Sequence, residues 1–111
     1  MWYVFPQIRG LGSSDTARLY AIASLAEAKA YLAHPVLGAR LRECTALVNS
    51  VPNRSAPDIF GSVDAMKFRS SMTLFREAAD DDDVFQDALD KYFDGKADEL
   101  TLGLLGKTGG P

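Results

Sequence analysis

The sequence has few of the residues that build metal sites and disulfides. One cysteine, Cys44, and one histidine, His34, stand among the 111 residues. A single cysteine excludes an intramolecular disulfide and is typical of a reducing compartment. Because the chain has no Cys/His cluster that could bind a metal ion, we expect neither a metal site nor a cofactor.

The chain also lacks a long apolar run and an excess of positive charge. No stretch approaches the roughly 18 apolar residues of a membrane span, and no basic segment precedes the apolar start, as a secretory signal requires. Twelve basic residues stand against fifteen acidic ones, which gives a net charge of −3. These features predict a cytoplasmic protein without a membrane or nucleic-acid partner.

The rest of the composition is that of an ordinary globular domain, with 47% hydrophobic and 24% charged residues. A chain of this length suits one domain with one core. We expect a single helical domain over residues 1–105, followed by a loose glycine-rich tail over residues 106–111.

Capping signals divide the chain into short helices. Ser24 with Glu27 matches a capping box, Ser55 precedes an early proline, and an aspartate run and Asp98 stand where later helices begin. The sequence therefore predicts an all-α fold, a bundle of about six short helices after an extended aromatic segment. The expected helices and helical turns span residues 15–23, 25–33, 35–50, 56–60, 63–78, 84–94 and 100–105.

Apolar residues at helical spacing predict the buried faces. The expected inward positions are Leu37, Leu41, Cys44 and Val48 in the third helix, Val63, Met66, Met72 and Phe75 in the fifth, and Val84, Phe85, Leu89, Tyr92 and Phe93 in the sixth. This places Cys44 as a buried structural thiol. His34 is expected to end a helix and to hydrogen-bond to its carbonyl groups.

The first twelve residues are rich in aromatic side chains and allow two interpretations. Trp2, Tyr3 and Phe5 can be core residues, because aromatic side chains supply much of a small core. They can also line a pocket for a ring-shaped ligand, in which Trp2 stacks while Gln7 and Arg9 orient the ligand.

Hydroxyl residues in the middle of the fifth helix form a second candidate. Lys67, Ser70 and Ser71 stand at positions i, i+3 and i+4, so they share one helical face. An ammonium group above two hydroxyls can hold an anion such as a phosphate or a carboxylate. The alternative is a polar flank whose small residues allow close packing.

The chain resembles the bacterial domain of unknown function 1810 family over nearly its whole length, to about Leu105. The matching stretches are the run from Trp2 to Gly12, Ser24 to Ala28 with Ala30 to Leu32, His34 to Gly38, Arg40 to Cys44, Ile59 to Gly61, and Lys67 with Ser70 to Phe75. The resemblance implies an all-helical protein. It also implies a truncated member, because such proteins have a further amino-terminal segment before the sequence that matches Trp2.

No activity is established for this family. The aromatic opening and the Lys67 helix are also similar to the NADAR group, which acts on N-glycosidic bonds of ADP-ribose-like molecules. The first hypothesis is therefore a pocket between residues 2–12 and 67–75 for a small anionic or nucleotide-like ligand, with an N-glycosidic hydrolase as its enzymatic form. The second is a non-enzymatic interaction module that associates, as a homodimer or with a partner, through its exposed aromatic opening.

Overall fold

The computed structural model describes residues 5–6, 22, 24–79 and 84–105. In these parts of the chain it contains six α-helices and no strand, so the predicted all-α class is confirmed. The helices are α2 (Leu25–Ala33), α3 (Leu37–Asn49), α4 (Ala56–Phe60), α5 (Ser62–Ala78), α6 (Val84–Phe93) and α7 (Glu99–Leu104). Three predicted features lie outside the described residues: the helix over 15–23 except for Ile22, the aspartate run over 80–83, and the tail.

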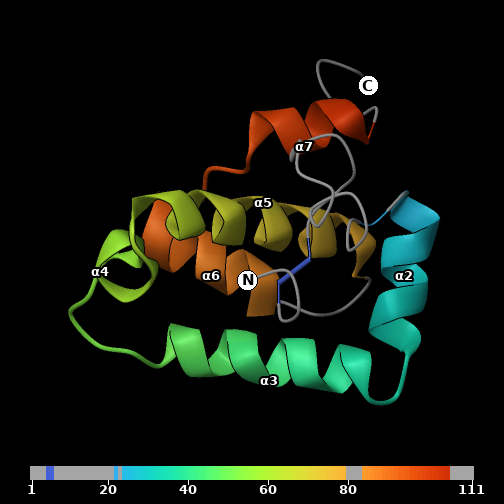
Figure 1. Ribbon diagram of the computed structural model, residues 1–111, viewed down its shortest axis with the longest axis horizontal. Coiled ribbons are helices and arrows are strands. Elements are labelled where there is room, and N and C mark those ends of the chain that lie inside the picture. The colour runs from blue at the N-terminus through green and yellow to red at the C-terminus, as the bar shows by residue number, and fades with distance from the viewer. Residues whose placement is uncertain (1–4, 7–21, 23, 80–83, 106–111) are drawn as a thin grey trace.

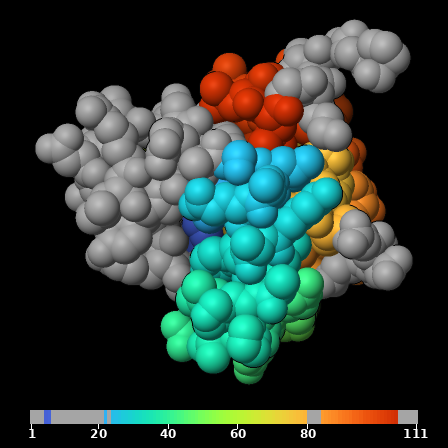
Figure 2. Space-filling model, turned by 90° about the vertical axis from the view of Figure 1, so that its right-hand side faces the viewer, coloured from blue at the N-terminus to red at the C-terminus, as the bar shows by residue number. Residues whose placement is uncertain are grey.

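Helix α5 is the central element, and α2, α4, α6 and α7 all pack against it (Figure 1). Helix α3 lies along the opposite side of α6 and connects to α2, which stands at one end of the molecule. Figure 2 shows that end, with α3 below α2 and α7 above it. None of the helices in the described residues is long and apolar enough to cross a membrane.

Side-chain caps start the short helices where the sequence predicted them. The Ser24 hydroxyl accepts a hydrogen bond from the Glu27 amide at 3.2 Å. At α4, the Ser55 hydroxyl accepts from the Asp58 amide at 3.2 Å, and the Asp58 carboxylate accepts from the Ser55 amide at 3.1 Å. The hydrogen bond from the Ser55 amide lowers the pKa of the Asp58 carboxyl. These local bonds satisfy amides that have no partner within the helix.

The beginning of α3 differs from the prediction. The helix begins at Leu37, two residues after Pro35, and His34 caps it. The His34 Nδ1 atom accepts hydrogen bonds from the amides of Val36 at 3.2 Å and Leu37 at 3.1 Å. The expectation that His34 ends a helix and bonds to its carbonyl groups is confirmed, because its backbone amide donates to the Ala30 and Tyr31 carbonyls of α2 at 3.1 and 3.2 Å. The ring adds a contact with the amides of the next helix that was not predicted.

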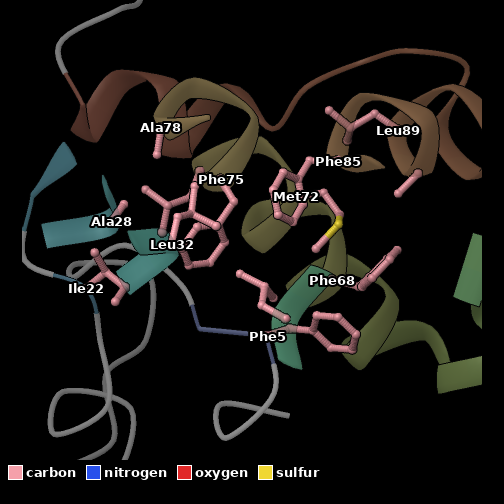
Figure 3. Close-up of a cluster of buried hydrophobic side chains, with 13 residues drawn as sticks. Phe5, Ile22, Ala28, Leu32, Phe68, Met72, Phe75, Ala78, Phe85 and Leu89 are labelled. Carbon is pink, nitrogen blue, oxygen red and sulfur yellow. The ribbon is translucent and has the colours of Figure 1, made fainter. Parts of the chain in front are cut away.

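The core lies between α5, α6, α2 and the opening segment (Figure 3). Its fully buried large side chains come mainly from α5 and α6 and include Phe68, Met72, Leu74, Phe75, Phe85 and Leu89. Leu41 of α3 is buried as predicted, while Cys44 and Val48 are partly buried against the core. Rings meet throughout this cluster, and Phe75 lies 5.8 Å from Phe85 between ring centroids.

Two predicted core positions of α5 were wrong. Val63 and Met66 are 69% and 68% exposed. The buried positions Phe68, Met72 and Phe75 follow alternating steps of four and three residues, and repeated steps of three toward Met66 and Val63 turn away from that face. Among the described helices, α2, α4, α6 and α7 pack against α5 and leave these two side chains exposed.

Helix α6 caps the carboxyl end of α3 with two side chains. The Tyr92 hydroxyl donates to the Val48 carbonyl, and the Lys91 ammonium donates to the Asn49 carbonyl. Both carbonyls belong to the last turn of α3, where the regular helix bonds end, and the Val48 carbonyl also accepts from the Val51 amide at 3.2 Å. The Lys91 Nζ atom also lies 5.4 Å from the centroid of the Tyr92 ring. The two helices are thus joined at a defined register.

This contact predicts a loss of stability at high pH. Burial raises the pKa of the Tyr92 phenol above its ordinary value, so the unfolded chain releases this proton first as the pH rises. The stability that the neutral phenol supplies is therefore complete below about pH 10 and is lost as the pH rises through the pKa of the folded protein. Tyr31 adds to this effect, since burial raises its pKa as well.

We expect the variant Tyr92→Phe to lose about 1 kcal/mol of unfolding free energy at neutral pH, because one hydrogen bond is removed. Its unfolding free energy should then fall less steeply than that of the parent protein between about pH 9 and 11. Urea unfolding at a series of pH values measures both effects. Parallel pH profiles for the two proteins would contradict the role assigned to the Tyr92 hydroxyl.

Candidate functional site

Helix α5 carries three buried hydroxyl side chains in one turn: Ser70, Ser71 and Thr73. Ser70 donates to the Met66 carbonyl at 3.1 Å and Thr73 donates to the Arg69 carbonyl at 2.9 Å. Both bonds reach back four residues, which is the usual solution for a hydroxyl inside a helix.

Ser71 departs from this pattern. Its side chain is fully buried, and its Oγ atom makes no hydrogen bond to any described residue. An unsatisfied buried hydroxyl costs roughly 1–3 kcal/mol, and such groups are rare in native proteins. Neither packing nor helix formation therefore explains why a serine stands at position 71 of α5.

Lys67 lies one turn before Ser71 on the same flank, as the sequence predicted. Its ammonium group lies 3.9 Å from the Asp64 carboxylate, and the two side chains are 31% and 45% exposed. We refer to Lys67, Ser70 and Ser71 as the hydroxyl flank of α5. Within it a partly exposed cation and two buried hydroxyls share one side of the helix.

Trp2, Gln7 and Arg9, which the sequence predicted as the other half of the site, lie outside the described residues. Phe5 of the same segment is described and is a core residue with 5% exposure. Its ring packs edge-on against Phe68, with the centroids 4.9 Å apart, and lies 6.1 Å from Phe60 (Figure 3). Phe5 therefore meets α5 at Phe68, the residue that follows Lys67.

Asp98 joins the hydroxyl flank to α7. Its Oδ2 atom accepts from Ser70 Oγ at 3.1 Å, from the Thr101 amide at 3.0 Å and from Thr101 Oγ1 at 2.6 Å. The Asp98 amide donates in turn to Thr73 Oγ1 at 2.9 Å. Since a carboxylate already faces Ser70, an anion would be repelled there, and the favourable contacts of the flank are those of Lys67 and Ser71.

Sequence reasoning found Asp98 as a helix cap and missed its contact with Ser70. The two residues are 28 positions apart, so no local spacing connects them. The available signal was the run of hydroxyls in α5, because serine and threonine are poor residues for a helix interior unless they have partners outside it.

A groove of about 490 Å³ lies beside α5 where the chain enters α7. Its lining residues are Arg69, Lys96, Ala97, Asp98, Glu99, Leu100 and Leu102. Arg69 donates from Nε to the Lys96 carbonyl and from Nη2 to the Ala97 carbonyl, both at 2.9 Å. Its guanidinium carbon also lies 5.7 Å from the centroid of the Phe93 ring. These contacts fix one wall of the groove.

Metal-binding geometry is absent from the described parts of the chain. No group of three His, Cys, Asp or Glu side chains comes together there. His34 is used as a cap, and Cys44 packs against the core. The groups that can recognise a ligand are therefore the hydroxyl flank and the groove.

Comparison with known proteins gives two matches. The family described as "Protein of unknown function (DUF1810)" matches residues 1–105. The crystal structure of the conserved hypothetical protein Rv1873 from Mycobacterium tuberculosis superimposes with a TM-score of 0.93 and 54% sequence identity. That match covers 95% of this chain and 75% of the other. No curated protein matches the chain.

Proposed function

The chain belongs to the DUF1810 family, whose function is unknown, and we propose that the domain binds a small anionic ligand. The ligand would be of nucleotide or phosphosugar type, and its site would be the hydroxyl flank of α5. In this proposal Lys67 and Ser71 contact the anionic group. Trp2 stacks on the ring of the ligand, and Gln7 and Arg9 orient it.

The Ser71 hydroxyl, which makes no hydrogen bond within the described residues, is the observation that carries this proposal. Alanine at this position would fill nearly the same space without an unpartnered donor, and it is a better helix former. The serine is therefore costly for folding alone. A phosphoryl oxygen that accepts from Ser71 Oγ would give the hydroxyl its missing partner.

Lys67 and Phe5 support the same location. The ammonium group of Lys67 stands one turn from Ser71 and supplies the positive charge that an anion requires. Phe5, which stands three residues after Trp2 and two before Gln7 in the sequence, contacts Phe68 in this part of α5. Because Ser71 is fully covered in the free protein, binding includes a local opening beside α5.

Hydrolysis of an N-glycosidic bond is the enzymatic form of this proposal, in keeping with the similarity of the opening and of the Lys67 helix to the NADAR group. An ADP-ribose-like molecule combines the ring, the sugar and the phosphate that these residues would contact. We place the domain in the cytoplasm, where such nucleotides and a reduced Cys44 are expected.

A thermal-shift experiment with ADP-ribose and with inorganic phosphate tests the proposal. A ligand that binds only the folded protein raises the unfolding midpoint, and a concentration of 100 times the Kd adds about 2.7 kcal/mol. We expect a clear rise with ADP-ribose. The rise should be mostly lost in Ser71→Ala and reduced about tenfold in apparent affinity in Lys67→Gln.

Lys29→Gln is the matched control for the lysine variant. Lys29 is exposed on α2, a different helix from the one that carries the flank, and its charge is removed in the same way. Equal responses of Lys29→Gln and Lys67→Gln would contradict the proposed site. An unchanged midpoint with both ligands would contradict the proposed ligand class.

A further inference from the structure

The groove beside α7 is lined by charges of both signs together with apolar side chains. Arg69 and Lys96 are cationic, Asp98 and Glu99 are anionic, and Ala97, Leu100 and Leu102 complete the lining. Its volume of about 490 Å³ lies in the range of small-molecule sites. A ligand that matches this lining has to carry both charges.

Arg69 and Asp98 are held in place by hydrogen bonds, and each of them keeps one side-chain atom that bonds to no described residue. Arg69 employs Nε and Nη2 on backbone carbonyls, and its Nη1 atom makes no hydrogen bond to a described residue. Asp98 employs Oδ2 for three donors, and within the same described parts Oδ1 accepts none. A fixed donor and a fixed acceptor therefore belong to the same groove, and neither needs to be reordered for binding.

The other two charged groups belong to side chains that no described residue neutralises. Lys96 and Glu99 are exposed, and neither takes part in an ion pair within the described residues. They stand three positions apart on either side of Asp98 and line one groove. This arrangement favours a ligand that has a negative group to face Lys96 and a positive group to face Glu99.

We propose that this groove binds a small zwitterion with an apolar substituent, of amino-acid type. The carboxylate of the ligand would lie at Lys96 and Arg69, its ammonium group at Glu99 and Asp98, and its apolar part on Leu100 and Leu102. The hydrogen bond between Ser70 and Asp98 links this groove to the hydroxyl flank, but the ligand contacts proposed for the two sites differ, and neither proposal depends on the other.

Titration of the ¹⁵N-labelled protein with L-leucine tests this inference by NMR. We expect chemical-shift changes centred on the amides of Ala97, Asp98 and Leu102, with a Kd of about millimolar size because the charges are exposed. N-acetyl-L-leucine keeps only the carboxylate and L-leucinamide keeps only the ammonium group. Each should bind at least about tenfold more weakly than L-leucine.

Variants separate the two charges of the site. Lys96→Gln should weaken L-leucine and N-acetyl-L-leucine by about fivefold to tenfold, and Glu99→Gln should do the same for L-leucine and L-leucinamide. Both side chains are exposed, so neither variant should unfold the domain. Lys29→Gln, on α2, should leave all three titrations unchanged.

The inference is overturned by any of three results. One is the absence of shift changes in the groove at tens of millimolar L-leucine, well above the expected Kd. The second is equal binding of the zwitterion and of its two half-charged analogues. The third is L-leucine binding that is unchanged in both Lys96→Gln and Glu99→Gln.

Discussion

Replacement of Phe68 by alanine is expected to remove about 3–5 kcal/mol from the free energy of unfolding. Phe68 is fully buried, and its ring contacts four other aromatic rings. The ring centroids lie 4.9 Å from Phe5 and Phe60 and 6.4 Å from Tyr92 and Phe93. Alanine would leave a cavity at the point where α4, α5, α6 and the opening segment meet. A domain of this size has only about 5–15 kcal/mol in total, so the variant should be near the limit of folding.

Met66→Ala provides the control for this experiment, since it removes a large apolar side chain from the same helix. Met66 is 68% exposed, so we expect a change within about 0.5 kcal/mol. Urea unfolding followed by circular dichroism measures both variants. Similar losses for the two would mean that α5 is rotated relative to its neighbours in a way that contradicts the structure.

Replacement of Gly38 by alanine is expected to cost about 3 kcal/mol. A Cβ atom at this position would lie 2.1 Å from the Leu32 carbonyl oxygen and 2.7 Å from its carbon. Both are backbone atoms, so they cannot rotate away as the end of a side chain can. The first turn of α3 would have to separate from α2, which would also break the hydrogen bond of 3.1 Å from Arg42 Nη1 to the same carbonyl oxygen.

Ala39→Ser gives the comparison at the next position. Ala39 is exposed in the same turn of α3, so one added atom there meets solvent, and we expect a change within about 0.5 kcal/mol. Thermal unfolding of both variants measures the difference. If Gly38→Ala were as stable as Ala39→Ser, the close approach of α2 and α3 at Gly38 would be wrong.

The helices could be predicted from the sequence because their signals are local. Ser24, Ser55 and Asp98 cap helices at the expected positions, and each cap is completed within three residues along the chain. The inward face of α5 was predicted only in part. Apolar residues occur on several sides of that helix, and only the positions of α6 and α7 decide which of them are covered.

The candidate site could be predicted where its residues share one helix. Lys67, Ser70 and Ser71 lie on one flank, as their spacing requires. The bond between Ser70 and Asp98, the contact of the His34 ring with the first amides of α3 and the close approach at Gly38 could not be predicted. Each of these depends on where the chain turns between helices, and periodicity carries no information about that direction.

The variant Ser71→Ala tests most directly whether Ser71 contacts a ligand, because a hydroxyl that binds a ligand and a hydroxyl that stabilises the fold predict different results. If Ser71 is kept for a ligand, the ligand-free variant should unfold at the same urea concentration as the parent protein or at a higher one, with up to about 1 kcal/mol gained. Its thermal response to ADP-ribose should be lost at the same time. A ligand-free variant that is less stable by about 1 kcal/mol or more and responds to ADP-ribose like the parent protein would contradict the account.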